Sequence, residues 1–158
     1  MGLDITAYRK LEVVENPVFD EDGVLENWDS EFQPGDSMKW SETHFPGRGE
    51  GIDPDKVYRY EEEFSFRAGG YGGYNRWRSQ LGDFKGDVAF QELINFADNE
   101  GVIGPVVSRK LAADFIKHEA EAKVFAKNLD DGEYWLARYA EWKHAFEVAA
   151  DDGAVNFC

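Results

Sequence analysis

Residues 108–149 read SRKLAADFIKHEAEAKVFAKNLDDGEYWLARYAEWKHAFEVA, the most strongly periodic part of the chain. From Ser108 as the N-cap, the first half predicts one helix of about 18–20 residues with an apolar stripe at helical spacing. A second helix begins near Asp130, where Glu133 has capping-box spacing, and ends at Gly153. A tight turn joins the two, so we expect an antiparallel hairpin. The inward-facing side chains are Leu111, Phe115, His118, Ala122, Phe125, Leu129, Trp135, Tyr139, Trp142, Phe146 and Ala149.

Two upstream segments show the alternation that is typical of strands. Leu3, Ile5 and Ala7 alternate with polar residues near the N-terminus, and residues 57–66 alternate aromatic with polar side chains. We expect these two segments to form an antiparallel pair. Residues 154–158 are expected to return as a short strand.

Two shorter helices are predicted between the strands and the hairpin. One covers residues 74–81, with Asn75 as its cap and Gly82 at its end, and the other covers residues 88–97. The region between the first two strands holds many Pro and Gly residues, so we expect loops there. The whole chain, residues 1–158, is predicted to be a single α+β domain: a small antiparallel sheet from the N-terminal half, packed against a C-terminal helical hairpin and two shorter helices.

The chain is strongly acidic, with a formal net charge of −15 at pH 7. The electrostatic field of this negative charge repels phosphate backbones and anionic membranes, so we expect no long nucleic acid and no membrane as partner. The charge is uneven: residues 1–53 carry −9, whereas residues 54–107 and 108–158 carry −3 each. Residues 15–31 hold seven acids, no base and interleaved apolar side chains, a pattern that predicts a loop anchored by its aromatics. Residues 48–78 hold five of the eight arginines.

Motifs for metals, nucleophiles and phosphate loops are absent. The acidic run at residues 20–23 lacks EF-hand ligand spacing, and His44, His118 and His144 are not spaced for zinc. Neither a nucleophile elbow nor a Walker loop occurs, so we expect no metal, no cofactor and no catalytic residue. His118 is expected to be a hydrogen-bonded core residue. The single cysteine, Cys158, and the lack of a long apolar run indicate a cytoplasmic protein.

Three segments combine glycines with side chains that make directional hydrogen bonds: residues 44–49, 66–78 and 96–105. The run Gly69–Gly73 lies just before a predicted helix, where free backbone N–H groups favour an anion. Arginine binds phosphate or carboxylate through paired hydrogen bonds, and tyrosine stacks on flat rings. The candidate ligand-binding residues are His44, Arg48, Arg67, Tyr71, Tyr74, Asn75, Arg76, Arg78, Asp98 and Glu100.

These residues suit a small anionic, nucleotide-like ligand. The arginines would supply charge, the tyrosines stacking, and the amide and carboxylates selectivity for a sugar or base. A structural interpretation competes with this one. In it, Arg67, Arg76 and Arg78 pair with the acidic run at residues 61–63 or with residues 15–31, and the glycine run is a mobile connection.

The opening MGLDITAY, residues 1–8, resembles the start of small uncharacterised proteins carried by phages and prophages. The segments FRAGGYGGYNRWR at residues 66–78 and ADNEGVIGP at residues 97–105 are similar to parts of the same group. The resemblance names no activity. Because many small phage proteins interfere with host defence, it implies a protein of the host cytosol that sequesters a nucleotide signal or blocks a host protein.

Three functional hypotheses follow, in order of preference. The first is a non-enzymatic, phage-type anti-defence protein that binds a small nucleotide-like ligand. The second is an acidic interaction protein in which residues 20–29 block the basic nucleic-acid-binding surface of a host protein. The third is a small enzyme that acts on a nucleotide-like or sugar ligand through His44, Asp98 or Glu100. A site shared between subunits would leave the same pattern, so a homo-oligomer is compatible with all three.

Overall fold

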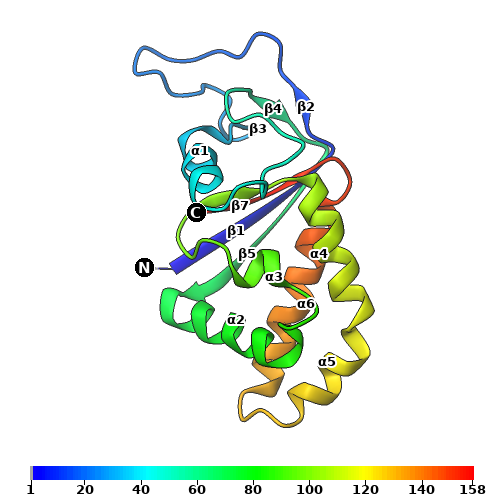
Figure 1. Cartoon of the computed structure of the whole chain (residues 1–158). Coiled ribbons are helices and arrows are strands. Elements are labelled where there is room, and N and C mark those ends of the chain that lie inside the picture. Colours follow the sequence, from blue (N-terminus) through cyan, green and yellow to red (C-terminus); the bar gives the residue numbers. More distant parts are fainter. Residues whose placement is uncertain (1) are drawn as a thin grey trace.

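The computed structural model describes residues 2–158. Its centre is a four-stranded antiparallel sheet in the order β5-β1-β7-β6 (Figure 1). The strands are β1 (Gly2–Arg9), β5 (Glu62–Gly70), β6 (Gly101–Ile103) and β7 (Ala154–Phe157). In the register, Ile5 of β1 lies opposite Phe66 of β5 and Phe157 of β7. The antiparallel pair and the C-terminal return strand are therefore confirmed, and the fold class is α+β as predicted.

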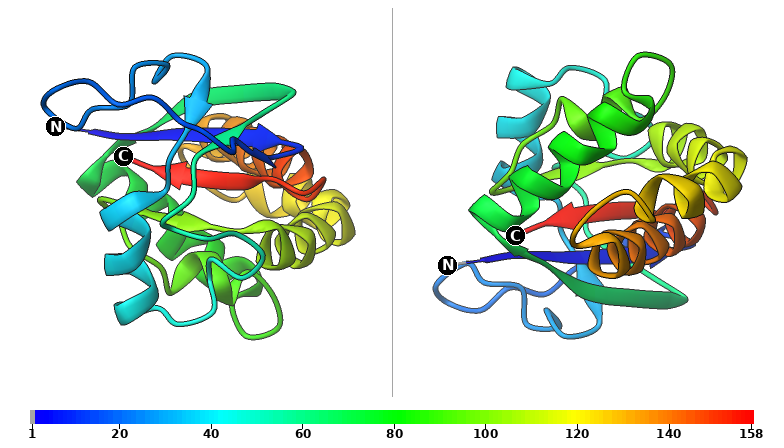
Figure 2. Two further views of the ribbon diagram at one scale, coloured as in Figure 1. Left: turned by 90° about the horizontal axis from the view of Figure 1, so that it is seen from above. Right: turned by 90° about the horizontal axis from the view of Figure 1, so that it is seen from below.

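Within residues 2–158, six helices accompany the sheet. They are α1 (Gly35–His44), α2 (Tyr71–Lys85), α3 (Gln91–Ile94), α4 (Pro105–Lys117), α5 (Glu119–Ala126) and α6 (Gly132–Ala149). Helices α2 to α6 lie on one side of the sheet (Figures 1 and 2). On the other side lie α1 and a small sheet in the order β2-β4-β3, formed by β2 (Glu12–Val13), β3 (Glu31–Phe32) and β4 (Tyr58–Arg59). In residues 2–158, none of the helices is both long and apolar enough to cross a membrane.

The period-two alternation of the strands places side chains in two separate cores. Leu3 and Ile5 of β1 face the helices, where the rings of Trp77, Trp135 and Trp142 are fully buried. Tyr8 of the same strand turns to the opposite face and packs in the smaller core with Phe32, Met38, Val102 and Ala154. Both faces of the sheet are thus covered over much of β6 and β7, which explains why every residue of the short edge strand β6 is buried.

Helix α1 was not expected, because Pro34 and Gly35 indicate a loop. Tertiary packing stabilises it. Met38 is buried in the smaller core, and the Ser41 hydroxyl accepts the Val102 N–H of β6 at 3.3 Å while donating to the Met38 carbonyl at 3.1 Å. Residues 57–66 also differ from the prediction, since the chain leaves the small sheet after Arg59 and enters the large sheet at Glu62.

The predicted middle helices are wrong in their limits. Helix α2 begins at Tyr71, with Gly70 as its N-cap, so Asn75 and Gly82 both lie inside it. Only Gln91–Ile94 of the predicted 88–97 helix is helical, because Phe90 adopts a left-handed conformation (φ 64°).

The predicted helix from Ser108 is in fact two helices that meet at His118. The Phe115 carbonyl, which a continuous helix would use for the N–H four residues later, accepts the Tyr139 hydroxyl at 2.7 Å. His118 is buried as expected. Its Nδ1 atom has no hydrogen-bond partner in the part of the chain that the structure describes, and lies 3.8 Å from the Glu121 carboxylate.

Candidate functional site

The three glycine-bearing segments contribute to different parts of the surface. Arg48 of the first segment binds the backbone around α3: its Nε donates to the Glu92 carbonyl at 2.9 Å and its Nη2 to the Asn95 carbonyl at 3.1 Å. His44 ends α1, with Nδ1 2.9 Å from the Trp40 carbonyl. The Arg48 guanidinium is therefore used to position neighbouring backbone.

Four predicted residues from the second and third segments do come together. Asn75 donates to the Asp98 carboxylate at 2.9 Å, and the Arg78 Nη2 lies 4.0 Å from the same carboxylate. Arg78 also donates to the Phe96 carbonyl, and its guanidinium lies 5.0 Å from the centroid of the Tyr74 ring. Burial raises the pKa of Tyr74, whose hydroxyl has no hydrogen-bond partner in residues 2–158. This cluster joins α2 to the segment before β6.

Arg67 and Arg76 lie apart from that cluster and from each other. The Arg67 Nε is 3.8 Å from the Asp4 carboxylate of β1, and the Arg76 Nη2 is 3.6 Å from the Asp131 carboxylate at the start of α6. The structural interpretation named the wrong partners for the arginines. Glu62 pairs instead with Arg9 at 2.6 Å, and Glu61 lies 3.9 Å from Lys10.

Tyr71 and Glu100 line a cavity of about 390 Å³ between the starts of α1 and α2 and the end of β7. It adjoins a second cavity of about 380 Å³, since Gln33 and Asn156 line both. No arginine lines either of these two cavities. Whether any of the ten predicted residues binds a nucleotide-like ligand stays a prediction, and the structure does not gather their arginines around one cavity.

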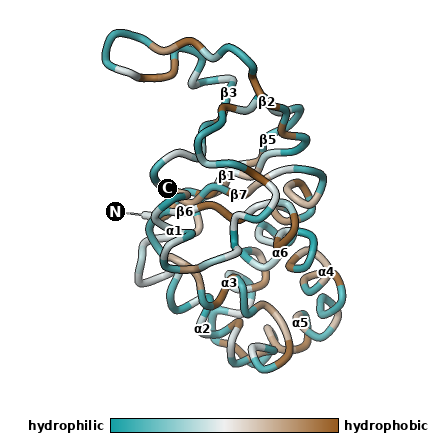
Figure 3. The backbone as a smooth tube through the Cα atoms, turned by 45° about the horizontal axis from the view of Figure 1, so that its top comes forward, coloured by the Kyte–Doolittle hydropathy of each residue, from teal (hydrophilic) through white to brown (hydrophobic). Residues whose placement is uncertain are grey.

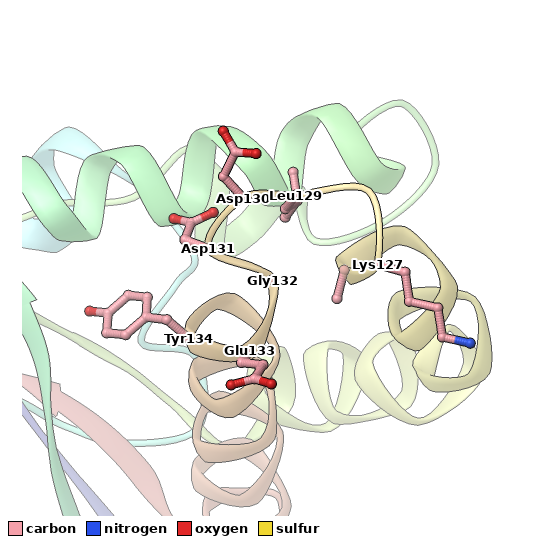
Figure 4. A pocket seen from close by; sticks show the side chains of 8 residues that line it. Lys127, Leu129, Asp130, Asp131, Gly132, Glu133 and Tyr134 are labelled. Atoms are coloured by element: carbon pink, nitrogen blue, oxygen red, sulfur yellow. The ribbon is translucent and has the colours of Figure 1, made fainter.

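The largest described cavity is also acidic. It has a volume of about 580 Å³ and surrounds the turn between α5 and α6 (Figure 4). Asp130, Asp131 and Glu133 line it, and the one cationic side chain, Lys127, points away from them in the figure. An anionic ligand would meet repulsion here.

Residues 15–31, called the acidic loop below, form an ordered hairpin that extends from the small sheet (Figure 1). Phe19 and Leu25 form a β-bridge, and the Asp20 carboxylate accepts the N–H groups of Asp22 and Val24, each at 2.9 Å. Gly23 occupies the left-handed region (φ 78°), which the turn requires. The carboxylate of Asp20 therefore stabilises the turn.

Apolar side chains of the acidic loop point into solvent. Leu25 is buried and anchors the loop, but Trp28 is 72% exposed, and Val18, Phe19 and Val24 are exposed as well. The expectation that the loop's aromatics anchor it is therefore wrong for Phe19 and Trp28. Figure 3 shows apolar and polar segments alternating along this loop.

The acids of the loop lack cationic partners. Within residues 2–158, no ion pair involves any of its seven carboxylates. The loop thus combines uncompensated negative charge with exposed apolar surface. The sequence already contained this signal, because Trp28 lies in a run with seven acids and no base.

Other lining residues were missed by the sequence analysis. Glu31, Gln33 and Asn156 line the 380 Å³ cavity beneath the acidic loop, together with Tyr8 and Trp28. Asn156 is a polar residue in the short strand β7, and Gln33 follows the short strand β3. Neither residue belongs to a sequence pattern that would indicate a binding site.

Comparisons with known proteins found no matching family model, no matching curated protein and no matching solved structure. In the described residues, no group of three or more His, Cys, Asp or Glu side chains is placed to hold a metal ion.

Proposed function

We propose that this chain is a protein-binding module whose acidic loop occupies a basic, nucleic-acid-binding surface of a partner protein. The observation that carries the proposal is the combination, on one ordered hairpin, of an exposed Trp28 and seven carboxylates that form no ion pair within residues 2–158.

Charge complementarity indicates the chemistry of the partner. A loop with seven acids and no base attracts a surface rich in lysine and arginine, and such surfaces are typical of proteins that bind phosphate backbones. Long-range attraction between the two surfaces would speed association and disfavour acidic partners.

The apolar side chains would supply the short-range part of binding. Tryptophan is among the residues that contribute most when buried at an interface, and Trp28 presents most of its surface to solvent. Because the hairpin is already held by the Asp20 turn and the buried Leu25, little chain ordering would oppose binding.

The resemblance to phage-borne proteins supports a partner in a bacterial host. In this proposal the chain would block a host protein by occupying the surface with which that protein binds nucleic acid. The arginine contacts described above favour this function over sequestration of a nucleotide, because Arg48 and Arg78 already bind backbone carbonyls.

The test is capture of proteins from a bacterial lysate by three forms of the tagged chain. The first is the wild type, and the second replaces Glu21, Asp22, Glu26 and Asp29 by their amides. Asp20 is kept because it stabilises the turn. The third is a control with the same change in charge, made at exposed acids outside the loop: Asp83, Asp87, Asp130 and Glu133.

We expect the wild type and the control to capture the same basic protein, and the loop variant to lose it. Added duplex DNA should release that protein from the wild type. Retention by the loop variant, or failure of DNA to compete, would overturn the proposal.

A further inference from the structure

We propose that the 380 Å³ cavity beneath the acidic loop receives an arginine side chain of the partner. This inference rests on the proposed function and names the residue type that the partner would insert. The volume lies within the range of roughly 300–1,000 Å³ that is common for ligand sites.

The lining of the cavity selects a cation. Glu31 is its single charged side chain, while Gln33 and Asn156 supply amide groups. Trp28, Tyr8 and Phe32 add aromatic surface, with the rings of Tyr8 and Phe32 stacked at a centroid distance of 4.5 Å. A phosphate or carboxylate would be repelled by Glu31, whereas a cation would be attracted.

The carboxylate of Glu31 also supports the proposal. Its Oε1 atom is buried and accepts no hydrogen bond in the part of the chain that the structure describes. A buried carboxylate oxygen without a donor is costly, and a donor supplied by a partner would remove that cost. Because this oxygen is shielded from solvent, the Glu31 side chain has to turn toward the cavity before a donor from outside the chain can reach it.

Arginine fits this lining better than lysine. Its planar guanidinium carries five N–H donors, enough for Glu31 and for the amide oxygens of Gln33 and Asn156 together. The same plane can stack on the exposed indole of Trp28, where cation–π attraction adds to the ion pair.

The adjoining cavity gives the partner chain room to continue. It shares Gln33 and Asn156 with the first cavity and is lined by Glu100, Tyr71 and Ser37, whose hydroxyl oxygen is buried without a partner in residues 2–158. A backbone N–H or a further polar side chain beside the arginine would meet Glu100 and Ser37 there.

The experiment uses the blocked peptide Ac-Gly-Ser-Arg-Gly-Ser-amide and its citrulline analogue, which keeps the shape of arginine without the charge. Each peptide is titrated into the ¹⁵N-labelled full chain while the Trp28 indole N–H signal and the Gly23 amide signal are followed. The same titration is done with Glu31→Gln, with Trp28→Ala and with the control Glu21→Gln, an exposed loop acid that does not line the cavity.

We expect the citrulline peptide to bind at least about tenfold more weakly than the arginine peptide, which corresponds to the loss of one strong ionic contact. Glu31→Gln and Trp28→Ala should each weaken binding severalfold, and Glu21→Gln should change it less than about twofold. Equal binding of the two peptides, no binding of either, or equal effects of Glu31→Gln and Glu21→Gln would overturn the inference. These outcomes leave lysate capture by the loop acids unaffected, so failure of the cavity is distinguishable from failure of the proposed function.

Discussion

Glu31 lies directly opposite Arg59 in the register of β3 and β4, yet within residues 2–158 no ion pair joins their side chains. The Glu31 carboxylate thus keeps one buried oxygen free of hydrogen bonds beside a cation on the neighbouring strand. Arg59 is a cation on the strand next to Glu31, and its charge would repel an incoming arginine. We predict that Arg59→Gln strengthens binding of the arginine peptide by about two- to threefold, since a nearby like charge is removed. The titration described above measures it, and weaker binding would show that Arg59 takes part in holding the peptide.

Trp28 should contribute strongly to partner binding and little to the stability of the fold. Trp28→Ala is expected to weaken partner binding at least about tenfold, because an exposed tryptophan buried at an interface is a typical hot spot. The free energy of unfolding should change by less than about 0.5 kcal/mol. Val124→Ala, an exposed apolar residue on α5, is the control and should leave binding unchanged. A large loss of stability in Trp28→Ala would contradict the exposed position.

Arg48 is expected to act on stability. Arg48→Met leaves the carbonyls of Glu92 and Asn95 without their donors, which should lower the free energy of unfolding by about 1–3 kcal/mol. Arg76→Met removes an exposed arginine with one distant ion pair and should cost less than about 0.5 kcal/mol. Urea unfolding of the two variants measures the difference, and equal stabilities would show that the Arg48 contacts contribute little.

Calorimetry separates the two leading hypotheses. With a panel of cyclic and ADP-ribose-type nucleotides we expect no heat of binding, since two of the four candidate arginines bind backbone carbonyls. The cavities at Asp131 and at Glu100 are moreover lined by acids and by no arginine. Heat that disappears in an Arg67→Ala Arg76→Ala double variant would instead support the small-ligand hypothesis.

The sequence predicts those parts of the fold in which one side of an element is buried. The alternation at Leu3, Ile5 and Ala7 and the helical stripe from Trp135 to Ala149 match the observed core. Helix α1 escapes prediction because its stability depends on contacts with β6 that are distant in sequence. The break at His118 depends likewise on the Tyr139 hydroxyl, which no local pattern reveals.

The candidate site is harder to predict, because the residue types alone do not show which side chains already bind other parts of the chain. The arginines of residues 48–78 suggest an anion site, but the structure shows that Arg48 and Arg78 bind backbone carbonyls. The acidic loop was visible as a charge pattern, whereas the exposure of Trp28 depends on the hairpin geometry. The cavity beneath the loop joins residues 8, 23–25, 28, 31–33 and 156, which only the folded chain brings together.

The most direct measurement is the dissociation constant of the captured basic partner for the wild type, the loop variant and the charge-matched control at low and high salt. At about 50 mM NaCl we predict that the loop variant binds at least about thirtyfold more weakly than the wild type and the control, and that this difference shrinks severalfold at about 500 mM because salt screens exposed charges. If the loop variant and the control weaken binding equally, or if the affinity of the wild type does not depend on salt, the acidic loop is not the binding surface.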